Sequence, residues 1–209
     1  MPLSKDPSCL GDSKQTALHR LNSLWRRLVQ DPKILELYIN FIHEYLKMGH
    51  MEVVEDEDSA IAYYLSHHGV YCHKSKITPL CVVFNASSII TSGESLNSLQ
   101  LNGGVIQRNL FSILLNFRAH KFKVTADIKK MFRMILNDES QHDLLRIIWK
   151  DKIDSPVEIF RLTRVTYSTK SSIPCDKIME TACHRYPLAA IVIMSDFCMD
   201  DFFSLVQTI

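Results

Sequence analysis

The sequence lacks a long hydrophobic run. Its longest uncharged apolar stretch near the end, LAAIVIM at 188–194, is far shorter than the roughly 20 residues that a membrane-spanning helix needs. The N-terminal segment MPLSKDPSCLG has no apolar core of the kind that a secretory signal contains. We therefore expect an intracellular protein without a membrane partner.

Cysteine pairs of the C-x-x-C type are also missing. Their absence gives no support to a zinc site, and the scattered positions give none to a disulfide framework. We expect all six thiols to be reduced. They are Cys9, Cys72, Cys81, Cys175, Cys183 and Cys198.

The composition is that of an ordinary globular protein. The chain has 209 residues, of which 46% are apolar and 22% charged, enough for one sizeable domain or two small ones. The net charge of +1 conceals a basic stretch from Lys74 to Arg133, with nine basic residues against two acidic ones. Such a stretch suits a polyanion, although solvated helix and strand faces would give the same pattern.

Two amphipathic helices are predicted in the first fifty residues. Apolar residues recur at helical spacing over 17–28 and again over 34–45. Asp31 fits an N-cap, Pro32 the first helical position, and Gly49 a helix stop. The acidic run EVVEDEDSA at 52–60 is expected to form an exposed loop, which separates a helical lead over 1–58 from a second region over 59–209.

The rest of the chain alternates strand and helix patterns, which predicts an α+β fold with helices on one face of a sheet. The adjacent His67 and His68 lie in a predicted strand, where neighbouring side chains point to opposite faces, so a shared metal ion is disfavoured. The expected strands are 62–72, 80–88, 121–128, 146–149 and 160–168, followed by two that turn around Asp200 and Asp201; the expected helices are 105–117 and one that opens at Pro174.

Three aspartates form a candidate metal site. Asp127 ends one predicted strand, and Asp200 with Asp201 would occupy a hairpin tip. Clustered carboxylates repel one another unless cations occupy the cluster, and Mg²⁺ prefers oxygen ligands. Two such ions can clamp the attacking and leaving oxygens of a phosphoryl transfer. A solvated turn with Asx chemistry is the alternative explanation of the Asp-Asp pair.

The order of these motifs resembles the reverse transcriptase of BEL/Pao-type LTR retrotransposon Pol polyproteins. The resemblance extends over roughly residues 15 to 205 and implies the fingers and a partial palm of that polymerase in residues 59–209. It is carried by ALHRLNSLWRRLVQDP, YINFIHEYLKMGHMEVV, YYLSHHGV, VVFNASSIITSGESLN, LFSILLNFRAHKFKVTADIKKMF, RVTYSTKSS and DFCMDDFF, in the family's order and close to its spacing.

The resemblance assigns catalytic and metal-binding roles to Asp127, Asp200 and Asp201. They would hold two Mg²⁺ ions, or Mn²⁺, while a primer 3′-hydroxyl attacks the α-phosphate of a deoxynucleotide. Phe132 matches the aromatic residue under the sugar of that nucleotide, although core packing would also explain it. The implied partners are an RNA or DNA template with its primer, a dNTP, and the remainder of a Pol polyprotein.

Some positions depart from the family pattern. Pro79 and Cys81 stand where two cations are expected near the triphosphate, a loss for which Lys74 or Lys76 could compensate. Ser168 replaces a glycine that faces template or nucleotide, and Cys198 replaces a tyrosine before the Asp-Asp pair.

These departures leave two hypotheses open. One is an RNA-directed DNA polymerase fragment that is weak in isolation, because the thumb is expected to be missing after residue 209. The other is a catalytically inactive retrotransposon relic, or a nucleic-acid-binding module. The resemblance places either of them in the cytoplasm, within a virus-like particle, or in the nucleus.

Overall fold

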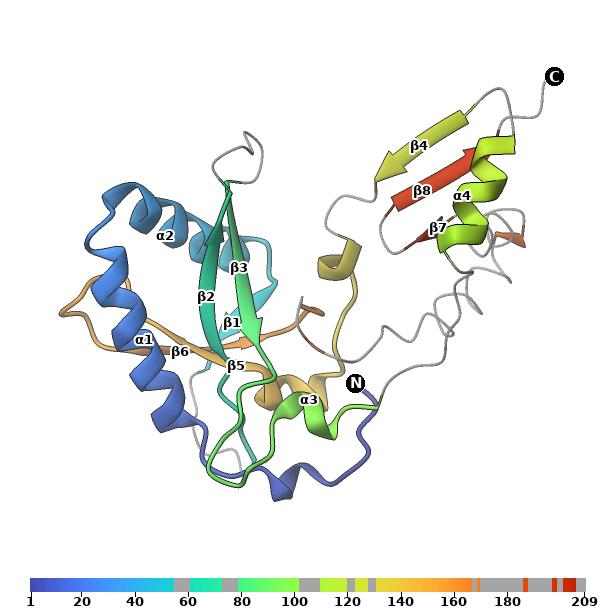
Figure 1. Cartoon of the computed structure of the whole chain (residues 1–209). Coiled ribbons are helices and arrows are strands. Elements are labelled where there is room, and N and C mark those ends of the chain that lie inside the picture. Colours follow the sequence, from blue (N-terminus) through green and yellow to red (C-terminus); the bar gives the residue numbers. More distant parts are fainter. Residues whose placement is uncertain are drawn as a thin grey trace. The chain divides into compact units, whose positions relative to one another are not determined.

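A computed structural model describes residues 1–54, 61–72, 79–101, 110–119, 123–127, 131–166, 169, 186–187, 197–198 and 201–205. These residues form a mixed α+β structure with antiparallel sheets (Figure 1). Two compact units divide the chain. Unit 1 comprises Met1–Leu101 and Phe132–Ser171, and unit 2 comprises Asn102–Met131 and Ser172–Ile209. The expected boundary between residues 58 and 59 lies outside the described residues.

The two N-terminal helices of unit 1 form as predicted. Helix α1 spans Lys14–Leu28 and α2 spans Pro32–Lys47. The Asp31 side chain accepts a hydrogen bond from the backbone N–H of Ile34 at 3.1 Å, which caps α2. Gly49 has φ +65°, the left-handed conformation in which helices commonly end and which glycine adopts without strain.

The first sheet of unit 1 has the order β1-β6-β5, with β1 at Met51–Val53, β5 at Arg146–Trp149 and β6 at Glu158–Leu162. The β5–β6 pairing confirms the predicted hairpin. The prediction of an exposed loop over 52–60 is wrong for its first two residues, because Glu52 and Val53 belong to β1. Glu52 pairs in register with Arg161 and accepts its Nε–H at 2.5 Å, so a cross-strand ion pair accommodates the acidic residue in a strand.

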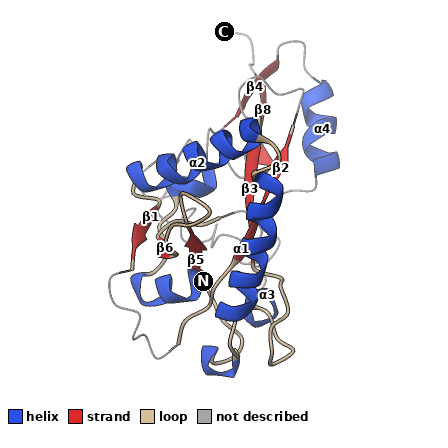
Figure 2. Ribbon diagram, turned by 90° about the vertical axis from the view of Figure 1, so that its left-hand side faces the viewer, coloured by secondary structure: helices blue, strands red, loops and turns tan. Residues whose placement is uncertain are grey.

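The second sheet is the hairpin of β2 (Ser66–Tyr71) and β3 (Leu80–Asn85), as predicted. Among the described residues the strands fall into three sheets, and the single sheet that the pattern favoured is therefore wrong. Beyond these strands, unit 1 contains η1 (Pro7–Cys9), α3 (Leu96–Leu99) and η3 (Glu139–Leu145). The 3-10 helix η2 (Met131–Met134) begins in unit 2 and continues into unit 1 from Phe132. Figure 2 shows the same elements from the side.

Aromatic side chains pack together in the core between the two helices and these sheets, alongside aliphatic ones. Trp149 stacks on Tyr38 with ring centroids 5.1 Å apart and packs against Trp25 at 5.4 Å. Arg146 lies among them with 1% of its surface exposed, and Asp143 and the Tyr64 hydroxyl bind its guanidinium. A buried charge needs such partners, because an unpaired one is costly.

Unit 2 contains a sheet of order β4-β8-β7 and one helix. The strands are β4 (Lys123–Asp127), β7 (Phe197–Cys198) and β8 (Asp201–Leu205), and α4 (Leu110–Ala119) packs against β7 and β8. Helix α4 confirms the later part of the helix predicted over 105–117. The helix expected from Pro174 lies outside the described residues. No helix in the described part of the chain is long and apolar enough to cross a membrane.

Candidate functional site

The sheet of unit 2 brings two of the predicted site residues together. Asp127 is the last residue of β4 and Asp201 the first of β8, and their α-carbons are register partners. Cys198, the last residue of β7, is in turn the partner of Asp201. Residues far apart in the sequence therefore meet at one end of a three-stranded sheet.

Local sequence explains why these strands form where they do. Lys123–Asp127 and Asp201–Leu205 are rich in β-branched and aromatic residues, which favour a pleated strand. The short distance in sequence between β7 and β8 suits an antiparallel hairpin. Pairing of β4 with β8 then sets the register that carries Asp127 to Asp201.

This juxtaposition has an electrostatic consequence. Like charges at directly opposite positions of an antiparallel pair destabilise it. A divalent cation would relieve that repulsion, and carboxylate oxygens are the ligands that Mg²⁺ prefers. The donor chemistry of Asp127 and Asp201 thus fits Mg²⁺. The side chains of Asp127 and Asp201 are not among those that the structure describes. Among the side chains that it does describe, no group of three or more His, Cys, Asp or Glu could hold a metal ion.

The other predicted site residues are distributed differently. Phe132 lies in η2, on the part of the chain assigned to unit 1, directly before Arg133. The Arg133 guanidinium lies over the rings of Tyr45, at 4.7 Å, and Phe41, at 5.4 Å. These cation–π contacts attach η2 to α2. Asp200, Lys74, Lys76 and Ser168 lie outside the described residues.

Besides Cys198, two of the departures from the family pattern lie in the described part of the chain. Pro79 directly precedes β3, and its carbonyl accepts a hydrogen bond from the Cys72 amide at 2.8 Å. Cys81 lies within β3 opposite Val70 and is partly exposed. Neither residue can supply a cation, so the end of the β2–β3 hairpin offers no positive charge at these two positions.

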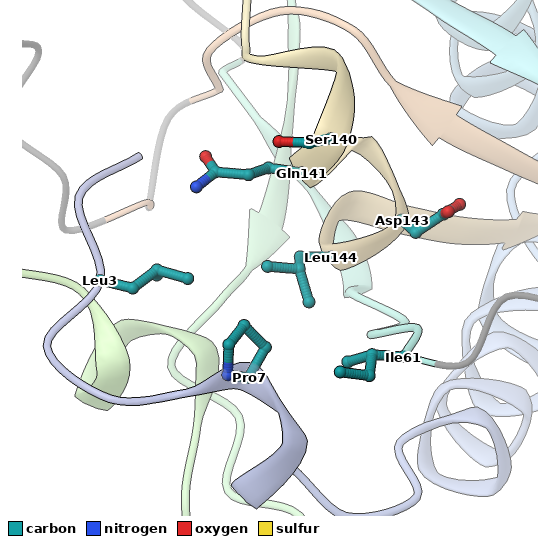
Figure 3. A pocket seen from close by; sticks show the side chains of 7 residues that line it. All are labelled: Leu3, Pro7, Ile61, Ser140, Gln141, Asp143 and Leu144. Atoms are coloured by element: carbon teal, nitrogen blue, oxygen red, sulfur yellow. The ribbon is translucent and has the colours of Figure 1, made fainter.

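A pocket of about 390 Å³ opens elsewhere in unit 1 (Figure 3). Its walls combine apolar side chains with the carboxylate of Asp143, which is also bound to Arg146. It contains none of the predicted site residues. Its lining consists of Leu3, Pro7, Ile61, Ser140, Gln141, Asp143 and Leu144.

One buried polar group has an environment that the sequence pattern did not predict. His67 is buried whereas His68 is exposed. The Nδ1 atom of His67 lies 2.6 Å from the Tyr38 hydroxyl, and its Nε2 atom lies 3.0 Å from the Ile148 carbonyl oxygen. Because a carbonyl only accepts, Nε2 carries the proton and Nδ1 accepts from Tyr38. The alternation of the strand indicated that one of the pair is internal, but its partners come from α2 and β5.

Burial lowers the pKa of His67 to about 4, and burial also raises the pKa of the Tyr38 hydroxyl. His67 is therefore neutral in the folded chain at pH 5, while its ordinary pKa of 6.5 lets the unfolded chain take up a proton there. The contribution of the neutral, buried His67 to the free energy of unfolding is therefore present in full above pH 6.5 and is lost as the pH falls toward 4. It amounts to about 3 kcal/mol over the whole window.

We expect the free energy of unfolding to fall between pH 7 and pH 5, by an amount that His67→Phe removes. Urea unfolding followed by circular dichroism measures it, each variant being compared with its own value at pH 7. His68→Gln is the matched control, because this exposed neighbour should leave the decrease intact. An undiminished decrease in His67→Phe would contradict the assignment.

No protein-family model matches the chain, and no curated protein matches it.

Proposed function

We propose that the chain is a reverse transcriptase domain, an RNA-directed DNA polymerase of the retrotransposon Pol type, made of fingers and part of a palm. The supporting observation is the register of unit 2, which sets Asp127 at the end of β4 opposite Asp201 at the start of β8. Aspartates from two distant motifs thereby meet, as the polymerase resemblance requires. An isolated turn with two solvated aspartates would not need Asp127 beside it.

In this proposal the residues of the chain bind and orient the reactants. Asp127, Asp200 and Asp201 would hold Mg²⁺, which when bound activates the primer hydroxyl and neutralises charge on the triphosphate. Phe132 would discriminate against a ribose 2′-hydroxyl. Ser168 would contact template or nucleotide.

The binding of phosphates is expected to be the weak part of this site. Lys74 and Lys76 are the candidates for compensating Pro79 and Cys81, because they belong to the connection between β2 and β3. Fewer fixed cations near a triphosphate mean less stabilisation of the charge that develops during transfer. We therefore expect slow extension with a high KM for the nucleotide.

Primer extension tests the proposal directly. On poly-rA with oligo-dT, dTTP and Mg²⁺ or Mn²⁺, we expect slow extension that falls about 10²- to 10³-fold in Asp200→Asn/Asp201→Asn, since metal ligation supplies several kcal/mol. Asp154→Asn, which changes an exposed aspartate of unit 1, should extend like the wild-type chain.

The outcomes separate the candidate functions. Equal extension by all the variants would reveal a contaminating polymerase and contradict the assignment of the aspartates. No extension by any of them, together with salt-dependent binding of the primer and template, would support the catalytically inactive nucleic-acid-binding module instead.

A further inference from the structure

The exposed face of helix α1 carries charge of one sign. The helix contains Lys14, Arg20, Arg26 and Arg27 but no aspartate or glutamate. Its apolar face is buried in the core of unit 1, and the three arginines are exposed. Figure 2, which looks from the left-hand side of Figure 1, has α1 in front of β2 and β3.

Helix stability does not account for all of this charge. Arg26 and Arg27 lie in the last turn, where they complement the helix dipole. Arg20 lies in the middle of the helix, where the dipole gives it no such benefit. The arginines form no ion pair with any described residue. The two aspartates at the ends of α1, Asp12 and Asp31, accept hydrogen bonds from backbone amides.

The geometry of the helix aligns these cations. Arg20 and Arg27 are seven residues apart, so they lie on the same side of α1, about 10.5 Å apart along its axis. His19 and Arg26 form a parallel row with the same spacing. Between the rows lies Ser23, also exposed, whose hydroxyl binds the His19 carbonyl.

We propose that this face of α1, defined by His19, Arg20, Ser23, Arg26 and Arg27, binds the phosphate backbone of a nucleic acid independently of sequence. Arginine and serine are among the side chains that commonly contact nucleic-acid phosphates, and a guanidinium group can bind a phosphate through two hydrogen bonds. A membrane fits less well, because the apolar face that would enter a bilayer is buried in the protein. A protein partner fits less well, because the face offers no aromatic anchor.

The surface would give the proposed polymerase a second contact to its template. It does not depend on catalysis, since it uses no residue of the aspartate site and none of the basic stretch from Lys74 to Arg133. Binding can therefore be measured without divalent cation or nucleotide, so the result can be interpreted even if the chain has no polymerase activity.

The test is fluorescence anisotropy of the full chain with a labelled DNA duplex and with a single strand, each in two unrelated sequences, over a series of salt concentrations. In Arg20→Gln/Arg27→Gln we expect duplex affinity to fall on the order of tenfold per arginine at low salt. The slope of log K against log salt should become shallower by about 2, and equally for both sequences. Arg20→Lys/Arg27→Lys should retain the slope, because it keeps the charges.

Lys47→Gln/Lys152→Gln is the matched control, with the same change of net charge at two exposed lysines outside α1. Exposed substitutions of this kind change stability by less than about 0.5 kcal/mol, and thermal melts verify that each variant is folded. If both glutamine double variants lose the same affinity for the duplex, the loss follows from the net charge of the chain and not from this face of α1, which would overturn the proposal. Binding of the wild-type chain to phosphatidylserine vesicles but not to nucleic acid would overturn it as well.

Discussion

Asp127→Asn and Asp201→Asn are each expected to lose most of the stabilisation that Mn²⁺ gives to the folded chain. A cation present at 100 times its Kd stabilises the state that binds it by about 2.7 kcal/mol. If the loss of one ligand weakens binding about 100-fold, the same concentration equals the new Kd, and only about 0.4 kcal/mol remains. The difference is large for a protein with marginal stability.

Without the cation the same substitutions should act in the opposite direction. Asp127 and Asp201 are register partners, so removing either charge relieves a like-charge cross-strand pair. We expect the variants to be more stable than the wild-type chain in EDTA by about 0.2 to 1 kcal/mol. This reversal of sign would separate a metal site from a structural aspartate pair.

Thermal melts with Mn²⁺ and with EDTA measure both effects, and the paramagnetic relaxation of water protons by Mn²⁺ measures binding directly. Asp154→Asn is the control, because it removes one exposed carboxylate from unit 1. If all three variants respond alike to Mn²⁺, the register of β4 and β8 does not create a cation site.

Trp149→Ala is expected to lower the free energy of unfolding of unit 1 by about 3 to 5 kcal/mol. Trp149 is 1% exposed, stacks on Tyr38, and donates its Nε1–H to the Asp151 carboxylate at 3.0 Å. Truncation would remove the ring and leave a cavity between α1, α2 and β5. Few single substitutions should cost more in this chain, because the ring joins both helices to the sheet.

Urea unfolding followed by far-UV circular dichroism measures the loss and does not rely on tryptophan fluorescence. Trp149→Phe is the graded control, which keeps an aromatic ring on Tyr38 but loses the hydrogen bond to Asp151. We expect it to retain most of the stability. A cost below about 1 kcal/mol for Trp149→Ala would contradict the packing described around this residue.

Local patterns were sufficient for the elements whose signals lie within a few residues. Helix α2 begins at its Asp31 cap and ends near Gly49, and the β2–β3 and β5–β6 hairpins join strands that are rich in β-branched and aromatic residues and close in sequence. Capping, helical spacing and hairpin pairing all act locally, so the sequence displays them directly.

Long-range pairing was hidden in the same patterns. Glu52 and Val53 carry a loop-like acidic signature, yet they pair with β6 more than a hundred residues away, where Arg161 compensates the charge. The buried environment of Arg146 escaped prediction for the same reason, because an arginine is ordinarily exposed and its burial depends on partners such as Tyr64 and Asp143. The relevant partners are neighbours in space and not in sequence.

The candidate site combines both kinds of information. The sequence alone specifies the carboxylates that the proposed cation site would use, those of Asp127, Asp200 and Asp201, because a carboxylate brings its chemistry wherever the chain places it. That Asp127 meets Asp201 follows from the tertiary pairing, since it depends on the register of β4 with β8, and a slip of one residue would separate them. The tertiary structure likewise decided that His67 is internal and neutral and that the arginines of α1 remain at the surface, because burial is a property of packing.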